Sequence, residues 1–177
     1  MNINTNTWNR LRYTLYSPFY NVIGKVFSKS RKRSIELLQV KPTDTVLLVG
    51  AGTGLDLDFL PPTAAITATD ITPAMVTRLA QRSARLQLPV KALVMDGQQL
   101  ALPDNAFDKI VLHLILAVIP DPVRCLQEAE RVLKPGGNIV VFDKFLPPGH
   151  QPGFSGGRLI FLLIFCSAIL PAVSKVF

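Results

Sequence analysis

The chain has 177 residues, which is long enough for one domain with a sizeable hydrophobic core. Its two cysteines and two histidines show no metal-ligand or disulfide spacing, which argues against a fold stabilised by a structural metal or by disulfides. The net charge of +7 resides in residues 1–41, where eight Lys or Arg accompany the single acid Glu36, while the other residues hold eleven charges of each sign. The amino-terminal residues contain no apolar signal-peptide core, so we expect a cytoplasmic protein.

Residues 1–41 are predicted to form a basic, amphipathic, helical cap. One interpretation places this cap on an anionic membrane surface, where each Lys or Arg contributes about 1 kcal/mol, which would make the protein peripheral to the membrane. The alternative is a solvated cap helix whose charges serve solubility. Nucleic acid is not an expected partner, because no platform of aromatic and basic side chains for bases accompanies the cluster.

The next feature is a glycine-rich turn. Four apolar residues, 46–49, followed by Gly50, Gly52 and Gly54 predict a buried strand that turns sharply into a helix. Such a turn needs glycine because a Cβ would block a ligand that lies against the backbone, and the following helix offers unpaired N–H groups to an anion. We therefore expect a nucleotide-like cofactor. The spacing departs from the G-x-G-x-x-G of dinucleotide-binding proteins, which leaves a nicotinamide-dependent oxidoreductase as the second alternative to the function predicted below.

A second strand and a helix follow the glycine-rich turn. Ala64 to Thr69 is predicted to be a strand that ends at Asp70, where a carboxylate can accept the ribose hydroxyls of a nucleoside. Thr72 and Pro73 are typical of the N-cap and first residue of a helix. Its buried face is predicted to comprise Met75, Val76, Leu79, Ala80 and Leu86.

Three more strands and another helix complete the predicted core. Val90 to Met95 is a strand that ends at Asp96 and Gly97, and Phe107 to His113 is the fourth strand. Asp121 caps a helix that ends at Leu133, before Lys-Pro-Gly-Gly at 134–137 and a fifth strand, Asn138 to Phe142. The alternation of strands and helices from 45 to 145 implies an α/β fold with a parallel sheet and helices on both faces.

In this order the motifs resemble those of class I S-adenosylmethionine-dependent methyltransferases. Val46-Leu-Leu-Val-Gly-Ala-Gly-Thr-Gly54 resembles motif I of that family, and Asp70-Ile-Thr-Pro-Ala-Met75 resembles its D-[IL]-[ST]-x-x-M segment. The stretch from Asp96 to Asp108 is similar to the signature D-[AG]-x-x-L-P-x-x-x-x-F-D. The resemblance implies a Rossmann-like three-layer sandwich with parallel sheet order 3-2-1-4-5, and transfer of a methyl group from S-adenosyl-L-methionine.

The resemblance also implies roles for single residues. The glycine loop would hold the methionyl part of the donor, Asp70 the ribose, and Asp96 the adenine amino group. Tyr13 and Tyr20 fall where many relatives have tyrosines in an amino-terminal lid. His113 is the catalytic candidate, with a core or cofactor-lining role as the alternative, and no metal site is expected. The implied cofactor-binding set is Gly50, Ala51, Gly52, Gly54, Asp70, Ile71, Met75, Asp96, Gly97, Tyr13 and Tyr20.

Two departures from the family pattern stand out. Leu48 occupies the position, two residues before Gly50, where relatives usually have an acid that orders the donor's amine. The predicted core, 42–148, is followed by residues 149–177, which are predicted to be a Gly/Pro-rich linker and an apolar carboxyl-terminal helix. Thirteen of the fifteen residues 159–173 are apolar, too few for a spanning helix, so we expect membrane, a partner chain or the core to cover this helix. Because the family usually continues into a helix and two more strands, strands 6 and 7 are expected to be missing.

The predicted function is transfer of a methyl group to a small or lipid-like acceptor. Parts of the sequence resemble bacterial phospholipid N-methyltransferase-like and quinone-methyltransferase-like proteins, which suggests a phospholipid amine or a quinone precursor. The alternative is a catalytically silent donor-binding or scaffold module, which Leu48 and the expected loss of two strands motivate.

Overall fold

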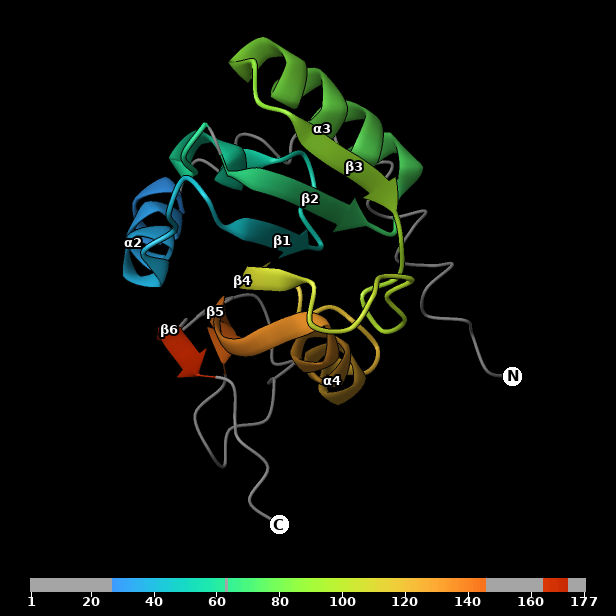
Figure 1. Ribbon diagram of the computed structural model, residues 1–177. Helices are drawn as coiled ribbons and strands as arrows, with labels where there is room; N and C mark the ends of the chain where they lie inside the picture. Colours follow the sequence, from blue (N-terminus) through green and yellow to red (C-terminus); the bar gives the residue numbers. More distant parts are fainter. Residues whose placement is uncertain (1–26, 63, 146–163, 172–177) are drawn as a thin grey trace, which may run out of the picture.

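The computed structural model of the chain describes residues 27–62, 64–145 and 164–171. Its centre is a six-stranded sheet with the order β3-β2-β1-β4-β5-β6, in which β6 alone is antiparallel to its neighbour. The five parallel strands confirm the expected order 3-2-1-4-5 (Figure 1). The strands are β1 (Thr45–Val49), β2 (Ala65–Asp70), β3 (Val90–Val94), β4 (Phe107–His113), β5 (Leu133–Phe145) and β6 (Ile164–Pro171).

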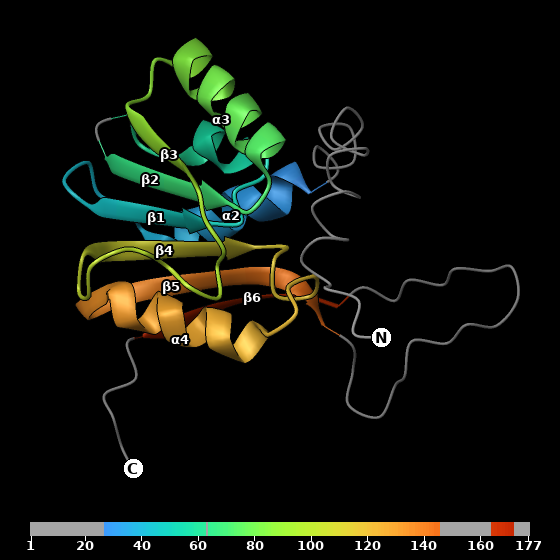
Figure 2. The same ribbon diagram turned by 90° about the vertical axis from the view of Figure 1, so that its right-hand side faces the viewer.

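Helices cover both faces of the sheet, as a parallel sheet requires. They are α2 (Ser28–Leu38), the short 3-10 helix η1 (Leu55–Phe59), α3 (Pro73–Leu86) and α4 (Pro122–Val132). Alternate residues of β1 face opposite layers: Val46 and Leu48 belong to a core cluster with α2 and α3, and Leu47 and Val49 to a cluster with α4. Figure 2 shows α4 in front of β5, while α2 lies behind the sheet.

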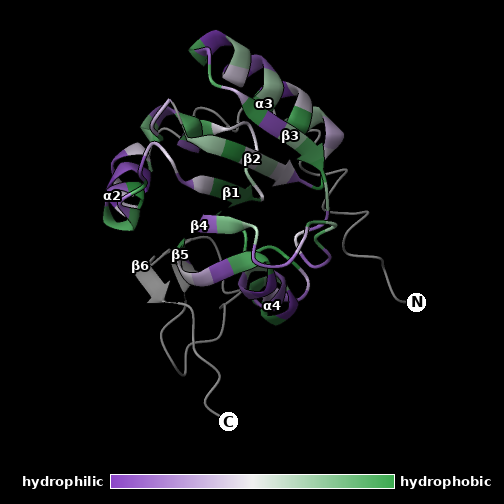
Figure 3. Cartoon of the chain, in the orientation of Figure 1, coloured by the Kyte–Doolittle hydropathy of each residue, from purple (hydrophilic) through white to green (hydrophobic). Residues whose placement is uncertain are grey.

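The sequence placed the helices well and their buried faces less completely. Asp121 caps α4 as predicted, accepting a hydrogen bond from the backbone N–H of Arg124 at 2.9 Å. Met75 and Leu79 of α3 are buried, but Leu86, the last residue of the helix, is 40% exposed. Ala80 is exposed as well, so the predicted face of α3 was too wide. The hydropathy colouring of α3 and α4 shows polar and apolar turns mixed on each helix (Figure 3).

The segment around Lys134-Pro-Gly-Gly137 differs from the prediction. It was expected to separate a helix from a strand that begins at Asn138, whereas β5 already begins at Leu133. A register shift between Phe107 and Lys109 of β4 accommodates this stretch, and Gly136 takes a φ of +79° within it. A β-bulge of this kind lets the strand continue through residues that would otherwise end it.

The predicted apolar carboxyl-terminal helix is wrong over residues 164–171. These residues form β6, which pairs antiparallel with β5 from Phe145↔Ile164 to Asn138↔Pro171. The segment contains Ile164, Phe165 and Ile169, which favour strands, and the edge of β5 offers backbone N–H and C=O groups for them to pair with. The sheet therefore has a sixth strand, which corrects the expectation that no strand follows the fifth.

Part of the predicted amino-terminal cap lies within the described residues. Helix α2 confirms a helix there, and Lys29, Lys32 and Arg33 are exposed on it, but Arg31 is buried. Tyr13 and Tyr20 lie outside the described residues. Among the residues that the structure describes, no helix is both long and apolar enough to cross a membrane.

Candidate functional site

The glycine-rich turn joins β1 to η1 at the carboxyl edge of the sheet. Gly50, Gly52 and Gly54 all have positive φ, at +66°, +56° and +78°, which explains why glycine occupies each position. A Cβ on Gly50 would also lie 2.4 Å from Cδ1 of Ile115. The backbone of the turn is thus brought close to the segment that follows β4, with no room for a side chain between them.

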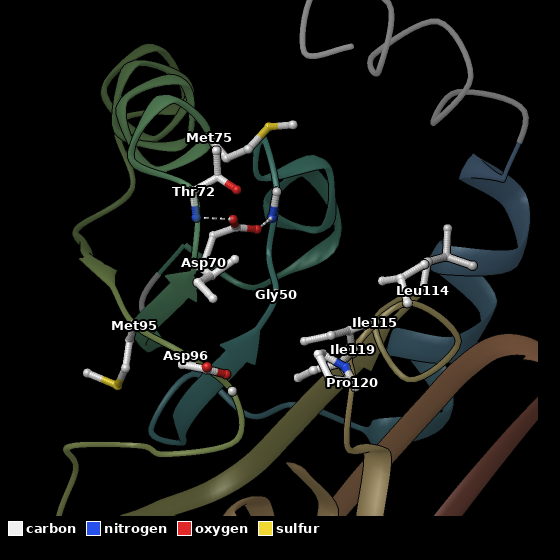
Figure 4. Close-up of a pocket in the computed structure, with 14 residues that line it drawn as sticks. Gly50, Asp70, Thr72, Met75, Met95, Asp96, Leu114, Ile115, Ile119 and Pro120 are labelled. Atoms are coloured by element: carbon white, nitrogen blue, oxygen red, sulfur yellow. Dashed lines mark hydrogen bonds between the residues drawn. The ribbon is translucent and has the colours of Figure 1, made fainter. Parts of the chain in front are cut away.

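Asp70, the last residue of β2, holds the turn in place. Its Oδ2 accepts the backbone N–H of Gly52 at 2.9 Å, and its Oδ1 accepts that of Thr72 at 2.8 Å (Figure 4). Burial raises the pKa of Asp70 above 3.8, while these two backbone hydrogen bonds act in the opposite direction. The side chain of Thr72 bonds to the same carboxylate, and because an ionised carboxylate offers about four lone-pair sites, acceptor capacity remains for a ligand.

A pocket opens between Asp70 and the segment after β4, with about 670 Å³ of empty space up to and including its open mouth. Asp70 lines one side, and Leu114, Ile115, Ile119 and Pro120 line the other (Figure 4). Asp96, which follows β3, lies between them and accepts hydrogen bonds from the backbone and side-chain N–H groups of Gln98 at 2.9 and 3.0 Å. The lining comprises residues 50, 52, 70–72, 75, 95–97, 114, 115 and 118–120.

The structure brings together most of the predicted cofactor-binding residues. Those that line the pocket are Gly50, Gly52, Asp70, Ile71, Met75, Asp96 and Gly97. Ala51 and Gly54 belong to the same turn but do not line the pocket. Ala51 is buried, and its N–H donates to the carbonyl of Thr69 at 2.8 Å. The predicted contacts of Tyr13 and Tyr20 fall on residues outside the described ranges.

The apolar side of the pocket, residues 114–120, was not among the predicted site residues. A signal for it existed, because this stretch directly follows a predicted strand of a parallel sheet, and ligands bind beyond the carboxyl ends of such strands. Thr72 was interpreted as a helix cap only and Met95 as part of a strand, yet both line the pocket. The pocket therefore has two carboxylates on a mostly apolar lining.

His113 is placed differently from the catalytic prediction. Its side chain is 2% exposed and does not line the pocket, because it points towards α2 on the opposite face of β4. Nδ1 lies 2.8 Å from Oδ1 of Asp56, and Nε2 lies 3.0 Å from the hydroxyl of Ser34. With both ring nitrogens in buried hydrogen bonds and no place in the described pocket lining, His113 has the surroundings expected for the core role that was the alternative interpretation.

A donor nucleoside fits the chemistry of this pocket. Asp70 offers acceptors for vicinal hydroxyls, Asp96 offers acceptors for an amino group, and the side chains of Ile71 and Met75 supply apolar surface for a flat ring. Gly50 and Gly52 of the turn also line the pocket, so their backbone borders the space that a longer chain of the ligand would occupy. Among the described residues, those that line the side with Leu114, Ile115 and Pro120 carry no charge.

Comparison with known proteins agrees with this chemistry. The phosphatidylethanolamine N-methyltransferase of Cereibacter sphaeroides is 35% identical over 124 residues, which are 69% of this chain and 61% of that protein. The demethylmenaquinone methyltransferase of Listeria monocytogenes is 28% identical over 171 residues, 91% of this chain and 70% of that protein. A solved SAM-dependent methyltransferase from Aquifex aeolicus superposes with a TM-score of 0.59 at 25% identity, covering 69% of this chain and 68% of that one.

The chain thus spans about 61% of the length of the first of these relatives. A family model described as a methyltransferase domain matches residues 47–141, from β1 to the middle of β5. These residues hold the glycine turn, both pocket carboxylates and the apolar side, and the methyl donor of the family is S-adenosyl-L-methionine. On the sequence match and on the geometry of the site, the chain belongs to the methyltransferase domain family.

Proposed function

We propose that the protein transfers a methyl group from S-adenosyl-L-methionine to a small or lipid-like acceptor. The observation that carries the proposal is the pocket at the carboxyl edge of the sheet, with Asp70 and Asp96 on a mostly apolar lining. Membership of the methyltransferase domain family supports a methyl donor over the nicotinamide cofactor of the oxidoreductase alternative.

The residues of the pocket have a positioning task in this reaction. S-adenosyl-L-methionine, when bound, supplies an activated methyl group on a sulfonium with a good leaving group. Asp70 would fix the ribose and Asp96 the adenine, while the backbone of Gly50 and Gly52 would lie against the amino-acid part of the donor. Alignment of donor and acceptor can supply roughly 7 to 11 kcal/mol of the barrier. The titratable side chains of the described lining are the carboxylates of Asp70 and Asp96, and both are assigned here to binding of the donor.

The proposed acceptor is a phospholipid amine or a quinone precursor. The side of the pocket formed by residues 114–120 is apolar, and Val118 there is 39% exposed, which suits an acceptor with an apolar body. Two curated relatives are named for phosphatidylethanolamine and demethylmenaquinone methylation, and they support these two acceptor classes.

The test measures radiolabel transfer. The purified full chain is incubated with methyl-labelled donor and, in separate reactions, with phosphatidylethanolamine vesicles and with a demethylated quinone in detergent. Label should appear in one of the two lipid products, and Asp70→Asn should reduce its rate. As a matched control, Asp108→Asn alters a carboxylate that bonds to Thr45 and Lys134 near the amino ends of β1 and β4, away from the pocket. This variant should retain transfer. Absence of label from both acceptors and from a total lipid extract would refute the proposal of a lipid-like acceptor.

A second candidate is a donor-binding module without catalytic activity. Leu48 favours it, because the position at which relatives carry an acid is here a leucine buried in the apolar cluster that faces α2 and α3. Calorimetry with S-adenosylhomocysteine separates the two candidates when combined with the transfer assay. Binding without transfer to any acceptor supports the module, and binding with transfer supports the enzyme.

We also propose that the protein is cytoplasmic and peripheral to an anionic membrane. Exposed Lys29, Lys32 and Arg33 of α2 support this contact, although Glu36 lies within 3.9 Å of the Lys32 ammonium and 3.8 Å of the Arg33 guanidinium. Flotation with vesicles that contain an anionic phospholipid, at low salt, should carry the protein upwards, and high salt should release it. A protein that stays at the bottom of the gradient at low salt refutes the contact.

A further inference from the structure

Four buried side chains from three segments form one hydrogen-bonded cluster beneath the pocket. Nη1 of Arg31 donates to Oδ2 of Asp56 at 2.7 Å, while the other oxygen of Asp56 lies 2.8 Å from Nδ1 of His113. The hydroxyl of Ser34 lies 3.0 Å from Nε2 of the same ring. We call these residues, Arg31, Ser34, Asp56 and His113, the buried cluster. None of them lines the pocket.

The charged groups of the cluster are buried away from solvent. Arg31, Ser34, Asp56 and His113 are at most 4% exposed, and Nε of Arg31 has no hydrogen-bond partner among the described residues. Burial alone would raise the pKa of Asp56, yet His113 and Arg31 together hold it well below its usual range. Buried ion pairs contribute little stability compared with apolar residues of the same volume, so stability alone does not explain this cluster.

One arm of the cluster reaches the glycine turn. Asp56 lies in η1, two residues after Gly54, and the N–H of Leu57 donates to the carbonyl of Gly54 at 3.1 Å. The N–H of Gly54 in turn donates to the carbonyl of Ala51 at 3.0 Å. Fixing the carboxylate of Asp56 therefore fixes the end of the turn whose middle residue, Gly52, Asp70 holds.

The other arm reaches the apolar side of the pocket. His113 is followed by Leu114, which lines the pocket and has a φ of +58°, a conformation that is strained for a leucine. The N–H of Leu114 donates to the carbonyl of Phe142 at 2.8 Å, and the ring of His113 packs edge-on against Phe142 at 5.6 Å. Such strain persists where the surroundings fix the residue on both sides, and the bonds of His113 supply one side.

Both arms meet on α2. Arg31 and Ser34 are three residues apart and so share one face of this helix, which packs against η1 and β4. We propose that the buried cluster is a set of positioning residues for the donor pocket, through which the docking of α2 holds the glycine turn and the residue-114 turn at the separation that the donor requires. The proposal rests on the proposed function for its ligand. It makes α2, which lies before the matched family segment, part of the donor site.

The first test compares the affinities of two variants, Asp56→Asn and Asp108→Asn, for S-adenosylhomocysteine by calorimetry. Asp56→Asn keeps the size of the side chain but breaks the charge balance of the cluster, and it should weaken binding about tenfold to a hundredfold. Asp108→Asn is the matched control, because Asp108 also accepts from a lysine and from Thr45, but at the amino edge of the sheet. Its dissociation constant should stay within about twofold of the wild type. Equal weakening by both variants, or none by Asp56→Asn, overturns the proposal.

A conservative pair separates positioning from packing. Arg31 contacts Asp56 through Nη1 alone, so Arg31→Lys can keep the ion pair, whereas Arg31→Met keeps much of the apolar stem and loses the charge. Arg31→Lys should restore the affinity that Arg31→Met loses, although both alter stability in urea. Equal affinity of the two variants contradicts a role for the ion pair.

A ligand-free measurement keeps the proposal testable if a variant folds poorly or the wild type gives no heat. Ser34→Ala removes one hydroxyl from the cluster and leaves the ion pair. In amide NMR spectra it should shift Gly52, Gly54 and Leu114, whereas Asp108→Asn should not. Unshifted pocket amides in Ser34→Ala refute the coupling. Absence of heat from the wild-type protein, with those amides shifted, counts instead against the proposed function.

Discussion

Gly50→Ala tests whether the pocket depends on the close approach of two backbone segments. Alanine at a φ of +66° costs about 1–2 kcal/mol, as left-handed backbone does for residues with a Cβ. The new Cβ would lie 2.4 Å from Cδ1, 2.9 Å from Cγ1 and 3.1 Å from Cβ of Ile115, so the whole side chain must move. Overpacking of this kind costs about 1–3 kcal/mol, which gives a total destabilisation of about 2–5 kcal/mol.

The same change should weaken donor binding, because Ile115 lines the pocket and is displaced by the new methyl group. Gly136→Ala is the matched control: its φ is +79°, but nothing lies within 4 Å of the Cβ, so it carries the backbone strain alone. The free energies of unfolding of the two variants, measured by urea denaturation, should differ by the cost of overpacking, about 1–3 kcal/mol. The double variant Gly50→Ala with Ile115→Ala should recover affinity for S-adenosylhomocysteine. Equal stabilities for Gly50→Ala and Gly136→Ala, with wild-type affinity in both, would refute the reasoning.

Four further outcomes are expected. Asp70→Asn should weaken S-adenosylhomocysteine binding by about 1.5–3 kcal/mol in calorimetry, since charged acceptors are lost. In the wild type, binding should decline as pH falls through the pKa of Asp70, which burial places above 3.8, and an affinity independent of pH down to 3.8 would contradict this. Because the folded state holds this proton more tightly than the unfolded chain, Asp70 lowers the free energy of unfolding as pH rises through the same range. Burial raises the pKa of Cys125 to about 12, so in a Cys166→Ser background a thiol reagent at neutral pH should label it only on unfolding, and fast labelling of the folded protein would be inconsistent with that burial. Asp121→Ala should cost about 0.5–2 kcal/mol in urea through loss of the α4 cap, with donor affinity retained, and an unchanged midpoint would rule out the cap.

Local patterns predicted the parallel core because each element follows from a few neighbouring residues. Phe107 to His113 is the fourth strand in both prediction and structure, and the glycines of the turn have the positive φ that their spacing indicated. The pocket position followed from topology, since strands that end at one edge bring Asp70 and Asp96 together.

Features that depend on distant partners were beyond the sequence. The direction in which His113 points is set by Asp56 and Ser34, which are 57 and 79 positions away along the chain. An apolar stretch such as 159–173 fits a buried helix or strand equally well, and for residues 164–171 the unpaired edge of β5 decides between them. No local pattern distinguishes Arg31 from the other basic residues of the amino-terminal cap, because its carboxylate partner, Asp56, is 25 positions away along the chain.

The pairing of β6 with β5 has a consequence for how chains of this protein can associate. An unpaired edge strand offers its N–H and C=O groups to a strand of another molecule. From Phe145↔Ile164 to Asn138↔Pro171 that edge of β5 is bonded within the chain, so in the described sheet intermolecular strand addition is left to the outer edges of β3 and β6.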